Sequence, residues 1–206
     1  MMYKSDIANM ALGRLGVSST ITDIESDFST EAKIIKRHFR TSLDYLLEQH
    51  FWNFARGTAV LIKQFDNPDS THLYSYYMPG DALLIRQLAF QGNFINGIEL
   101  YPDQKIPFDE VYVGTTRLIY TNLSEAEAEY TKQVAENSVF PSHFGRALAA
   151  LLSKDIAPSL ITSNYPKVRE TLNADAENDI AHGIADDLTR TPQQVNAESS
   201  FVRARY

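Results

Sequence analysis

Residues 43–62 of the chain, LDYLLEQHFWNFARGTAVLI, decide the fold, because the spacing of apolar residues changes within them. Up to His50 apolar side chains recur every three or four positions, which is the spacing of one helix face. From Gly57 onward the apolar run at residues 58–62 is typical of a β-strand. The two patterns meet at an aromatic cluster around Trp52. The sequence therefore predicts that a helical part of the protein joins a β part at this point.

Two helices are predicted before the junction. Residues 4–16 carry apolar side chains at helical spacing, and Gly16 suits the position after a helix end. The second helix is expected to begin at an N-cap at Ser26 or Asp27 and to run to about His50. Helical periodicity returns only at Pro141, after the β part.

Two further helices and an arm are predicted after Pro141. The first of these helices is expected to kink or end at Pro158, because proline lacks the backbone N–H that an interior helical position uses. The second runs from about Pro166 to about residue 185. Residues 187–206 mix Thr, Pro, Gln, Asn and Ser without a helical period, so they are expected to form an extended C-terminal arm.

The segment from Gly57 to about Phe140 is predicted to be a mostly antiparallel β domain. Short apolar or aromatic runs alternate there with turn residues, and Gly92 and Gly97 bracket a predicted tight hairpin. The expected strands are residues 58–62, 74–78, 82–90, 111–113, 116–121 and 128–134.

These patterns predict an α+β protein. A helical bundle of about four helices, formed by residues 1–56 and 141–186, is interrupted by a β domain at residues 57–140, and the arm follows at 187–206. Charge divides the chain in the same way: the net charge is zero for residues 1–56, −6 for the β segment and −1 for the remainder. The excess of acidic groups therefore belongs to the β segment.

The composition excludes several classes of function. The chain of 206 residues has no cysteine, which removes disulfide frameworks, thiolate zinc sites and cysteine nucleophiles and fits a reducing compartment. A net charge of −7 argues against a polyanion-binding protein. No apolar run approaches the length that spans a bilayer, and the first residues lack the apolar run of a signal peptide. We therefore expect a soluble, acidic protein that is not secreted and does not contact a membrane.

No catalytic or cofactor-binding motif is found in the sequence. Phosphate-binding loops, nucleophile elbows, zinc-binding helices and calcium loops are all missing, so no catalytic residue, metal or cofactor is expected. Glu125, Glu127 and Glu129 alternate along a predicted strand and should face water, because three carboxylates on one face repel one another. The histidines are scattered and are predicted to be structural or solvated (His38, His50, His72, His143 and His182).

Two charged groups on the helices are candidates for contacts. The second helix carries a basic stripe, which we interpret as a solvated or ion-pairing face in preference to a phosphate-binding one. On the fourth helix Asp175, Glu177 and Asp179 form an acidic group that offers too few oxygens to hold a cation alone. The aromatic cluster around Trp52 is expected to pack between the two parts of the protein and not to stack on a base. The basic stripe consists of Lys33, Lys36, Arg37 and Arg40.

Short segments of the chain also follow one another in a familiar order. They are IANMALGRLG at 7–16, WNFA at 52–55, YYMPGD at 76–81, a strand centred on Tyr130, FPSHF at 140–144 and SFVRAR at 200–205. With these segments the chain resembles, over nearly its whole length, the head-to-tail adaptor family of short-tailed bacteriophages, called tail tubular protein A.

The resemblance implies a structural protein that catalyses nothing. Identical subunits would form a ring matching the twelve-fold portal protein on one side and contacting a tail nozzle, similar to tail tubular protein B, on the other. Double-stranded DNA would pass through the lumen without specific binding. Such a protein would be made in the host cytoplasm and located in the virion tail next to the portal. The acidic β segment fits a conduit, because cationic contacts to phosphate would slow DNA passage.

Two other readings stay open. The first is a cell-wall (peptidoglycan) hydrolase of the phage tail that uses Glu48 together with an acid of the β segment. The second is a regulatory DNA-binding protein, which the net charge and the absence of a clustered basic recognition helix disfavour.

Two sets of contacts are predicted for the adaptor. In the ring, the basic stripe of one subunit is expected to meet the acidic group of its neighbour, including Asp175 and Asp179, because heterologous rings join two different surfaces. The arm ends in aromatic and arginine side chains, the residue types that dominate interface hot spots. The resemblance favours docking of this arm on the portal through Phe201, Val202, Arg203, Arg205 and Tyr206.

Overall fold

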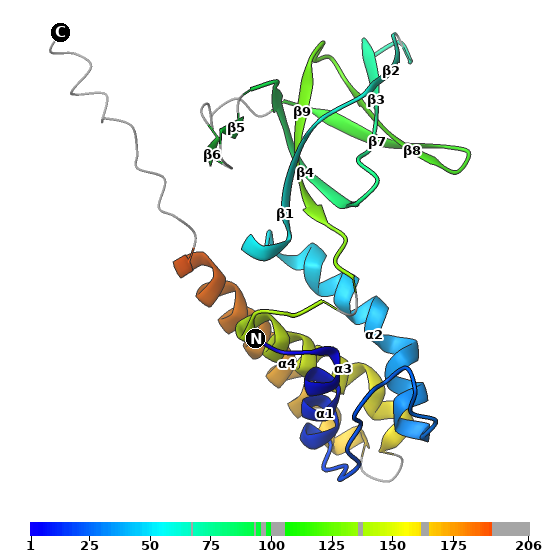
Figure 1. The fold of residues 1–206 in the computed structure, drawn as a ribbon, viewed down its shortest axis with the longest axis vertical. Helices are drawn as coiled ribbons and strands as arrows, with labels where there is room; N and C mark the ends of the chain where they lie inside the picture. The colour runs from blue at the N-terminus through cyan, green and yellow to red at the C-terminus, as the bar shows by residue number, and fades with distance from the viewer. Residues whose placement is uncertain are drawn as a thin grey trace, which may run out of the picture.

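The protein has a helical part, at the bottom of Figure 1, and a β part, at the top. A computed structural model describes residues 1–66, 68–92, 94–95, 98–99, 106–135, 138–161 and 165–190. Four α-helices and two antiparallel sheets confirm the predicted α+β class. All the strands lie in the chain between the second and third helices. Among the described residues no helix is long and apolar enough to cross a membrane.

The first two helices are α1 (Lys4–Arg14) and α2 (Thr30–Gln49). At the start of α1 the Asp6 carboxylate accepts the backbone N–H of Tyr3 at 2.9 Å. The predicted N-cap of α2 at Ser26 or Asp27 was wrong, because the hydroxyl of Ser29 accepts the N–H of Ala32 and caps the helix. Asp27 instead accepts the N–H of Ser29 at 2.7 Å and so holds the loop that leads into the helix.

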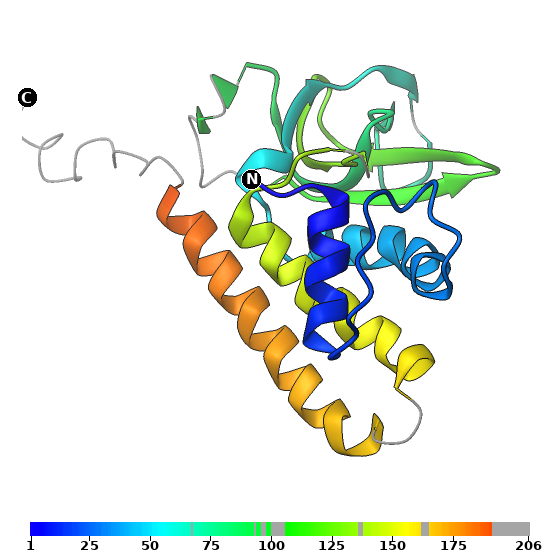
Figure 2. The ribbon, with the colours of Figure 1, turned by 60° about the horizontal axis from the view of Figure 1, so that its bottom comes forward.

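The last two helices are α3 (Ser142–Leu160) and α4 (Tyr165–Arg190), which pack side by side (Figure 2). Helix α3 does not end at Pro158, as one of the two predicted outcomes had it, but runs through the proline and ends two residues later. The prediction for α4 was wrong at its end, since the helix continues from Asp187 to Arg190, where the arm was expected to begin. The buried side chain of Asp187 is held by tertiary contacts that the local composition does not reveal. The rest of the predicted arm, residues 191–206, lies outside the described residues.

The strands form two sheets and a hairpin, all antiparallel. In the three-stranded sheet β9 lies between β1 and β4, and in the four-stranded sheet the order is β2-β3-β8-β7. The predicted hairpin at residues 92–97 corresponds to β5 and β6, which pair with each other. The strand bounds are β1 (Arg56–Val60), β2 (Lys63–Asp66), β3 (Tyr74–Tyr77), β4 (Ala82–Phe90), β5 (Phe94–Ile95), β6 (Ile98–Glu99), β7 (Phe108–Val113), β8 (Thr116–Thr121) and β9 (Ala126–Lys132).

Gly57 lies within a strand and does not merely end the helical pattern. It pairs with Tyr130 of β9, and a Cβ atom at this position would lie 2.7 Å from the Cζ atom of that tyrosine. The Tyr130 ring thus occupies the space that a side chain at residue 57 would need. Because Arg56 and Gly57 already pair with Thr131 and Tyr130, β1 begins two residues before the predicted residue 58.

The acidic side chains of β9 are more buried than the sequence predicts. Glu127 and Glu129 are each only 8% exposed, so the expectation that they face water was wrong. The N–H of Gly92 donates to Glu127 at 2.9 Å, and the amide of Gln87 donates to Glu129 at 2.9 Å. Both hydrogen bonds come from the β4 side of β9, since Gln87 lies in β4 and Gly92 follows it, and they offset the burial of the carboxylates.

Two separate apolar cores correspond to the two parts of the protein. The bundle core gathers side chains from all of α1, α2 and α3 together with Trp52 and Phe140, and α4 contributes Ile180 and Ile184 at its edge. The β core lies between the two sheets around Tyr76, Ile119 and Tyr130. Since the cores do not merge, the relative position of the two parts depends on the residues between them.

Candidate functional site: the junction of the two parts

The junction consists of the end of α2, the 3-10 turn η1 (Asn53–Ala55), Arg86 of β4 and Asp187 of α4. Trp52 lies at its centre and is fully buried. Its indole N–H donates to the carbonyl of Leu46 at 2.7 Å, and its ring meets Phe144 edge-on with centroids 4.9 Å apart. Trp52 thus packs within the bundle core and not, as had been predicted, between the two parts, and a fully buried ring is not available to stack on a base.

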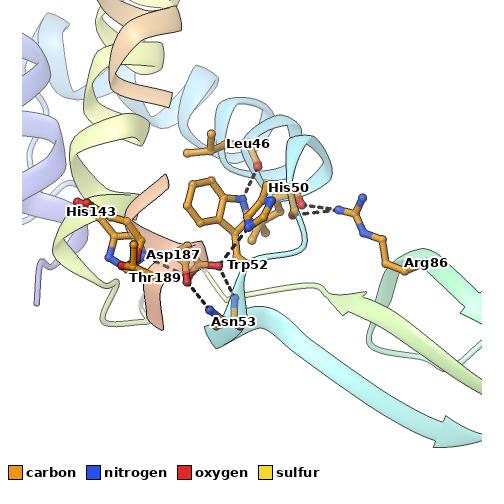
Figure 3. Close-up of polar contacts among 10 residues, drawn as sticks. Leu46, His50, Trp52, Asn53, Arg86, His143, Asp187 and Thr189 are labelled. Carbon is orange, nitrogen blue, oxygen red and sulfur yellow. Dashed lines mark hydrogen bonds and ion pairs between the residues drawn. The ribbon is translucent and has the colours of Figure 1, made fainter. Parts of the chain in front are cut away.

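Arg86 ties the β domain to the C-terminal end of α2 (Figure 3). Its Nη2 group donates to the carbonyls of Leu47, Glu48 and His50, each at 3.0 Å. Its Nε group donates to the hydroxyl of Thr131 on β9 at 2.8 Å. The last carbonyls of a helix lack hydrogen-bond partners within the helix and carry partial negative charge. The guanidinium of Arg86 donates hydrogen bonds to them and also brings the opposite charge.

A second cation reinforces the contact through Phe51. The guanidinium of Arg56 lies 4.3 Å from the centre of the Phe51 ring, and that of Arg86 lies 5.6 Å from it. Both cations come from strands and the ring comes from the end of α2. These cation–π contacts therefore also join the β domain to the bundle.

Asp187 is the polar centre of the junction on the bundle side and is only 2% exposed. One carboxylate oxygen, Oδ2, lies 3.2 Å from Nε2 of His50 and accepts the N–H of Asn53 at 3.0 Å. The other, Oδ1, lies 3.3 Å from Nε2 of His143. The side-chain amide of Asn53 also donates to the carbonyl of Asp187 at 2.8 Å. Figure 3 shows this carboxylate between the two imidazole rings.

Burial sets the protonation of His50. Desolvation lowers the pKa of His50 below its ordinary value, although the nearby Asp187 carboxylate opposes the shift, and Arg56 and Arg86 add to the lowering. At neutral pH the ring is therefore uncharged. A neutral imidazole still donates one N–H, and with the proton on Nε2 it forms a hydrogen bond to Asp187.

This arrangement holds three segments of the chain together. The Nε2 atoms of both His50 and His143 contact the same carboxylate, and the side chain of His143 is only 4% exposed. Within the described part of the chain, no group of three or more histidine, aspartate or glutamate side chains could hold a metal ion. The sequence predicted structural histidines but did not bring His50, His143 and Asp187 together, because long tertiary contacts leave no spacing signal.

The predicted basic stripe of α2 is not one continuous free surface. Lys36 pairs with Glu25, and Arg40 donates to Asp44 of the same helix at 2.8 Å and to the carbonyl of Val134, just after β9, at 3.2 Å. Lys33 and Arg37 are exposed.

The predicted acidic group of α4 is divided in the same way. Asp179 pairs with Arg14 of α1 within the chain, whereas Asp175 and Glu177 are exposed. The interface between the two groups therefore stays a prediction, for which the exposed members of each group are the available contacts.

Two hollows on the bundle surface have mixed linings. One of about 340 Å³ lies between the start of α1 and the following loop, with Lys4, Asp23 and Glu25 in its walls. Another of about 230 Å³ lies between α3 and α4, with Arg146, Asp179 and His182 in its walls. Glu48, the predicted hydrolase residue, is exposed on α2 and lines neither of them.

The β domain exposes large apolar side chains where its first strands meet and at the tip of the β7–β8 hairpin. Such side chains are candidates for contacts with other proteins. The predicted portal contacts Phe201, Val202, Arg203, Arg205 and Tyr206 lie outside the described residues and stay a prediction. The exposed side chains in these two regions are Val60 (52%), Ile62 (72%), Tyr77 (43%), Tyr112 (67%) and Val113 (49%).

Four of the six segments on which the phage-adaptor resemblance rests meet in pairs. Phe54, from the segment at 52–55, meets Phe140 and Phe144 from the segment at 140–144, with ring centroids 6.4 and 4.8 Å apart. The hydroxyl of Tyr130 donates to Asp81, the last residue of the segment at 76–81, at 2.9 Å. No protein-family model matches the chain, and no curated protein matches it.

Proposed function

We propose that the protein is a non-enzymatic head-to-tail adaptor of a short-tailed phage. In this role, a ring of identical subunits joins the portal to the tail nozzle and forms part of the channel through which DNA is ejected. The observation that carries the proposal is the meeting of the motif segments at the junction and in the β domain. Segments distant in the chain contribute to shared contacts, as expected if the motifs preserve one architecture.

The two-part architecture supports this role. An adaptor must contact one neighbour on each side and transmit force between them without coming apart. The bundle and the β domain offer two different surfaces, and Arg86 and Phe51 connect them through hydrogen bonds and cation–π contacts. A junction whose polar groups connect the two parts in this way suits a protein that transmits force between its neighbours.

The charge distribution also supports a conduit for DNA. The β segment carries most of the net negative charge of the chain, and negative walls do not retain a polyanion. The exposed cations Lys33 and Arg37 are too few for tight binding to phosphate and are available to the neighbouring subunit.

Electron microscopy of the purified protein with and without its portal tests the proposal. We expect separate subunits or small assemblies alone, and a ring of added density on the portal when both are mixed. Mixtures in which the portal particles keep their original outline would contradict the proposal. Peptidoglycan turnover that is lost in Glu48→Gln would instead support the hydrolase.

A further inference from the structure

A continuous series of polar contacts crosses the junction from the β domain to the last turn of α4. Thr131 accepts from Arg86, and Arg86 donates to the carbonyl of His50. The ring of the same His50 contacts Asp187, and Asp187 contacts His143 on α3. His50 is thus the shared member, since its backbone faces the β domain and its ring faces α4.

The backbone of His50 makes this sharing sensitive to position. His50 follows α2 in an extended conformation, with φ −146° and ψ 154°. Its carbonyl and its ring therefore point in different directions, although both are attached to the same short stretch of backbone. If Arg86 leaves the carbonyl, the orientation of that stretch is no longer fixed. The Nε2 atom of His50 then loses its defined position opposite the Asp187 carboxylate.

The last turn of α4 depends strongly on Asp187. The neighbouring residues of this turn point outward: Leu188 is 56% exposed, and Thr189 and Arg190 are also exposed. Asp187 accepts the N–H of Asn53 and contacts both histidines, and its carbonyl accepts the Asn53 amide. A helix end with few buried apolar contacts opens readily when its anchor is removed.

From this geometry we infer that Asp187 is a latch that couples the last turn of α4 to the seating of the β domain on α2. With Arg86 in place on the end of α2, His50 and Asn53 are positioned to hold Asp187, and the turn at residues 187–190 is closed. When Arg86 is displaced, the turn opens, and opening of the turn in return loosens the end of α2. The coupling is reciprocal, as thermodynamic linkage requires of two sites that share one equilibrium.

The latch also determines the position of Arg190, the last residue of α4. Arg190 is held in place in the closed state and free to move in the open state. The orientation of the β domain is thereby communicated to the C-terminal end of the described chain. This property belongs to a single subunit, so it does not depend on the adaptor function.

Hydrogen exchange measured by mass spectrometry on the full chain tests the coupling. Asp187→Asn removes the charge from the anchor, and Arg86→Gln disrupts the opposite end of the contact series without touching α4. Both variants are expected to speed amide exchange at residues 187–190 at least tenfold, and Asp187→Asn is also expected to speed exchange at residues 50–55. Asp186→Asn makes the same chemical change at an exposed neighbouring position and should exchange like the parent.

The decisive result is the one obtained with Arg86→Gln. Faster exchange confined to the end of α2 and the β domain, with residues 187–190 unchanged, would overturn the latch. Equal effects of Asp186→Asn and Asp187→Asn would also overturn it, because the response would not be specific to the buried carboxylate. Should Arg86→Gln fail to fold, Arg86→Lys keeps the charge but not the several hydrogen bonds of the guanidinium, and the same expectation applies to it.

Tryptic cleavage after Arg190 gives an independent readout. A protease needs several residues around the cleaved bond in extended form, so a closed turn at 187–190 protects this site. Cleavage should be at least tenfold faster in Arg86→Gln than in the parent. Equal cleavage rates in these two proteins would contradict the coupling.

Discussion

The interior of the bundle and the junction above it are held together in different ways. The bundle core is almost wholly apolar, and among its few buried polar groups Ser42 simply donates to Asp155 at 2.7 Å. At the junction, by contrast, Arg86 and Asp187 each make several hydrogen bonds to backbone or side-chain groups. Apolar packing is not directional, whereas hydrogen bonds fix angles. The comparison teaches that the bundle supplies stability and the junction supplies orientation.

Trp52 belongs to both regions, so its removal should have the largest effect. Trp52→Ala deletes a fully buried ring and leaves the carbonyl of Leu46 without its donor. We expect a loss of about 3–5 kcal/mol in the free energy of unfolding, measured by urea denaturation. Tyr45→Ala, at a half-exposed position of α2, should cost no more than about 0.5 kcal/mol. Similar losses in the two variants would contradict the burial of Trp52.

A methyl group at residue 57 tests the fit of the β domain where it leaves the junction. Gly57→Ala places a Cβ atom against the ring of Tyr130 and should destabilise the protein by about 1–3 kcal/mol. The matched change Gly13→Ala on α1 meets no atom within 4 Å and should stabilise the helix by about 0.5–1 kcal/mol. Thermal unfolding of both variants gives the comparison, and a gain in stability for Gly57→Ala would refute the close approach.

Acidification should weaken the junction. The folded pKa of His50 lies below the ordinary value of 6.5, so the unfolded chain binds more protons as the pH falls through that value. The stability that His50 contributes is therefore complete above about pH 7 and declines below pH 6.5. We expect the urea midpoint to fall from pH 7.5 to pH 5.5 by more in the parent than in His50→Gln. Equal declines would show that the pKa of His50 is the same in the folded and the unfolded protein, and would contradict the lowered value.

Replacing surface charges should have the smallest effect on folding, although it should measurably change assembly. Lys36→Glu with Arg37→Glu should change the free energy of unfolding by no more than about 0.5 kcal/mol, because exposed ion pairs contribute little. If the protein has the proposed adaptor function, the same double variant should reduce the number of subunits bound per portal, measured by sedimentation. Asp175→Lys with Glu177→Lys on the same chain should restore binding. If the second pair of substitutions does not restore binding, the two surfaces do not contact each other in the ring.

The sequence predicted the elements better than their polar connections. Helix spacing in residues 28–50 and the change at Gly57 were sufficient for the helices and the boundary between the two parts, because apolar burial leaves a period in the chain. The end of α4 was missed because the contacts of Asp187 to His50 and Asn53 span more than a hundred residues. The burial of Glu127 was not predicted for a similar reason. Its partner is the backbone N–H of Gly92, a group that every residue type except proline supplies, so the sequence carries no sign of it.

A distance measurement between the two parts tests most directly the claim that the junction fixes their orientation. The chain has no native cysteine, so Asn178→Cys on α4 and Thr115→Cys at the β7–β8 turn accept spin labels selectively. Electron–electron double resonance should give one narrow distance distribution in the otherwise unchanged protein and a broad one after Arg86→Gln. A distribution that is already broad before Arg86 is changed would contradict the account.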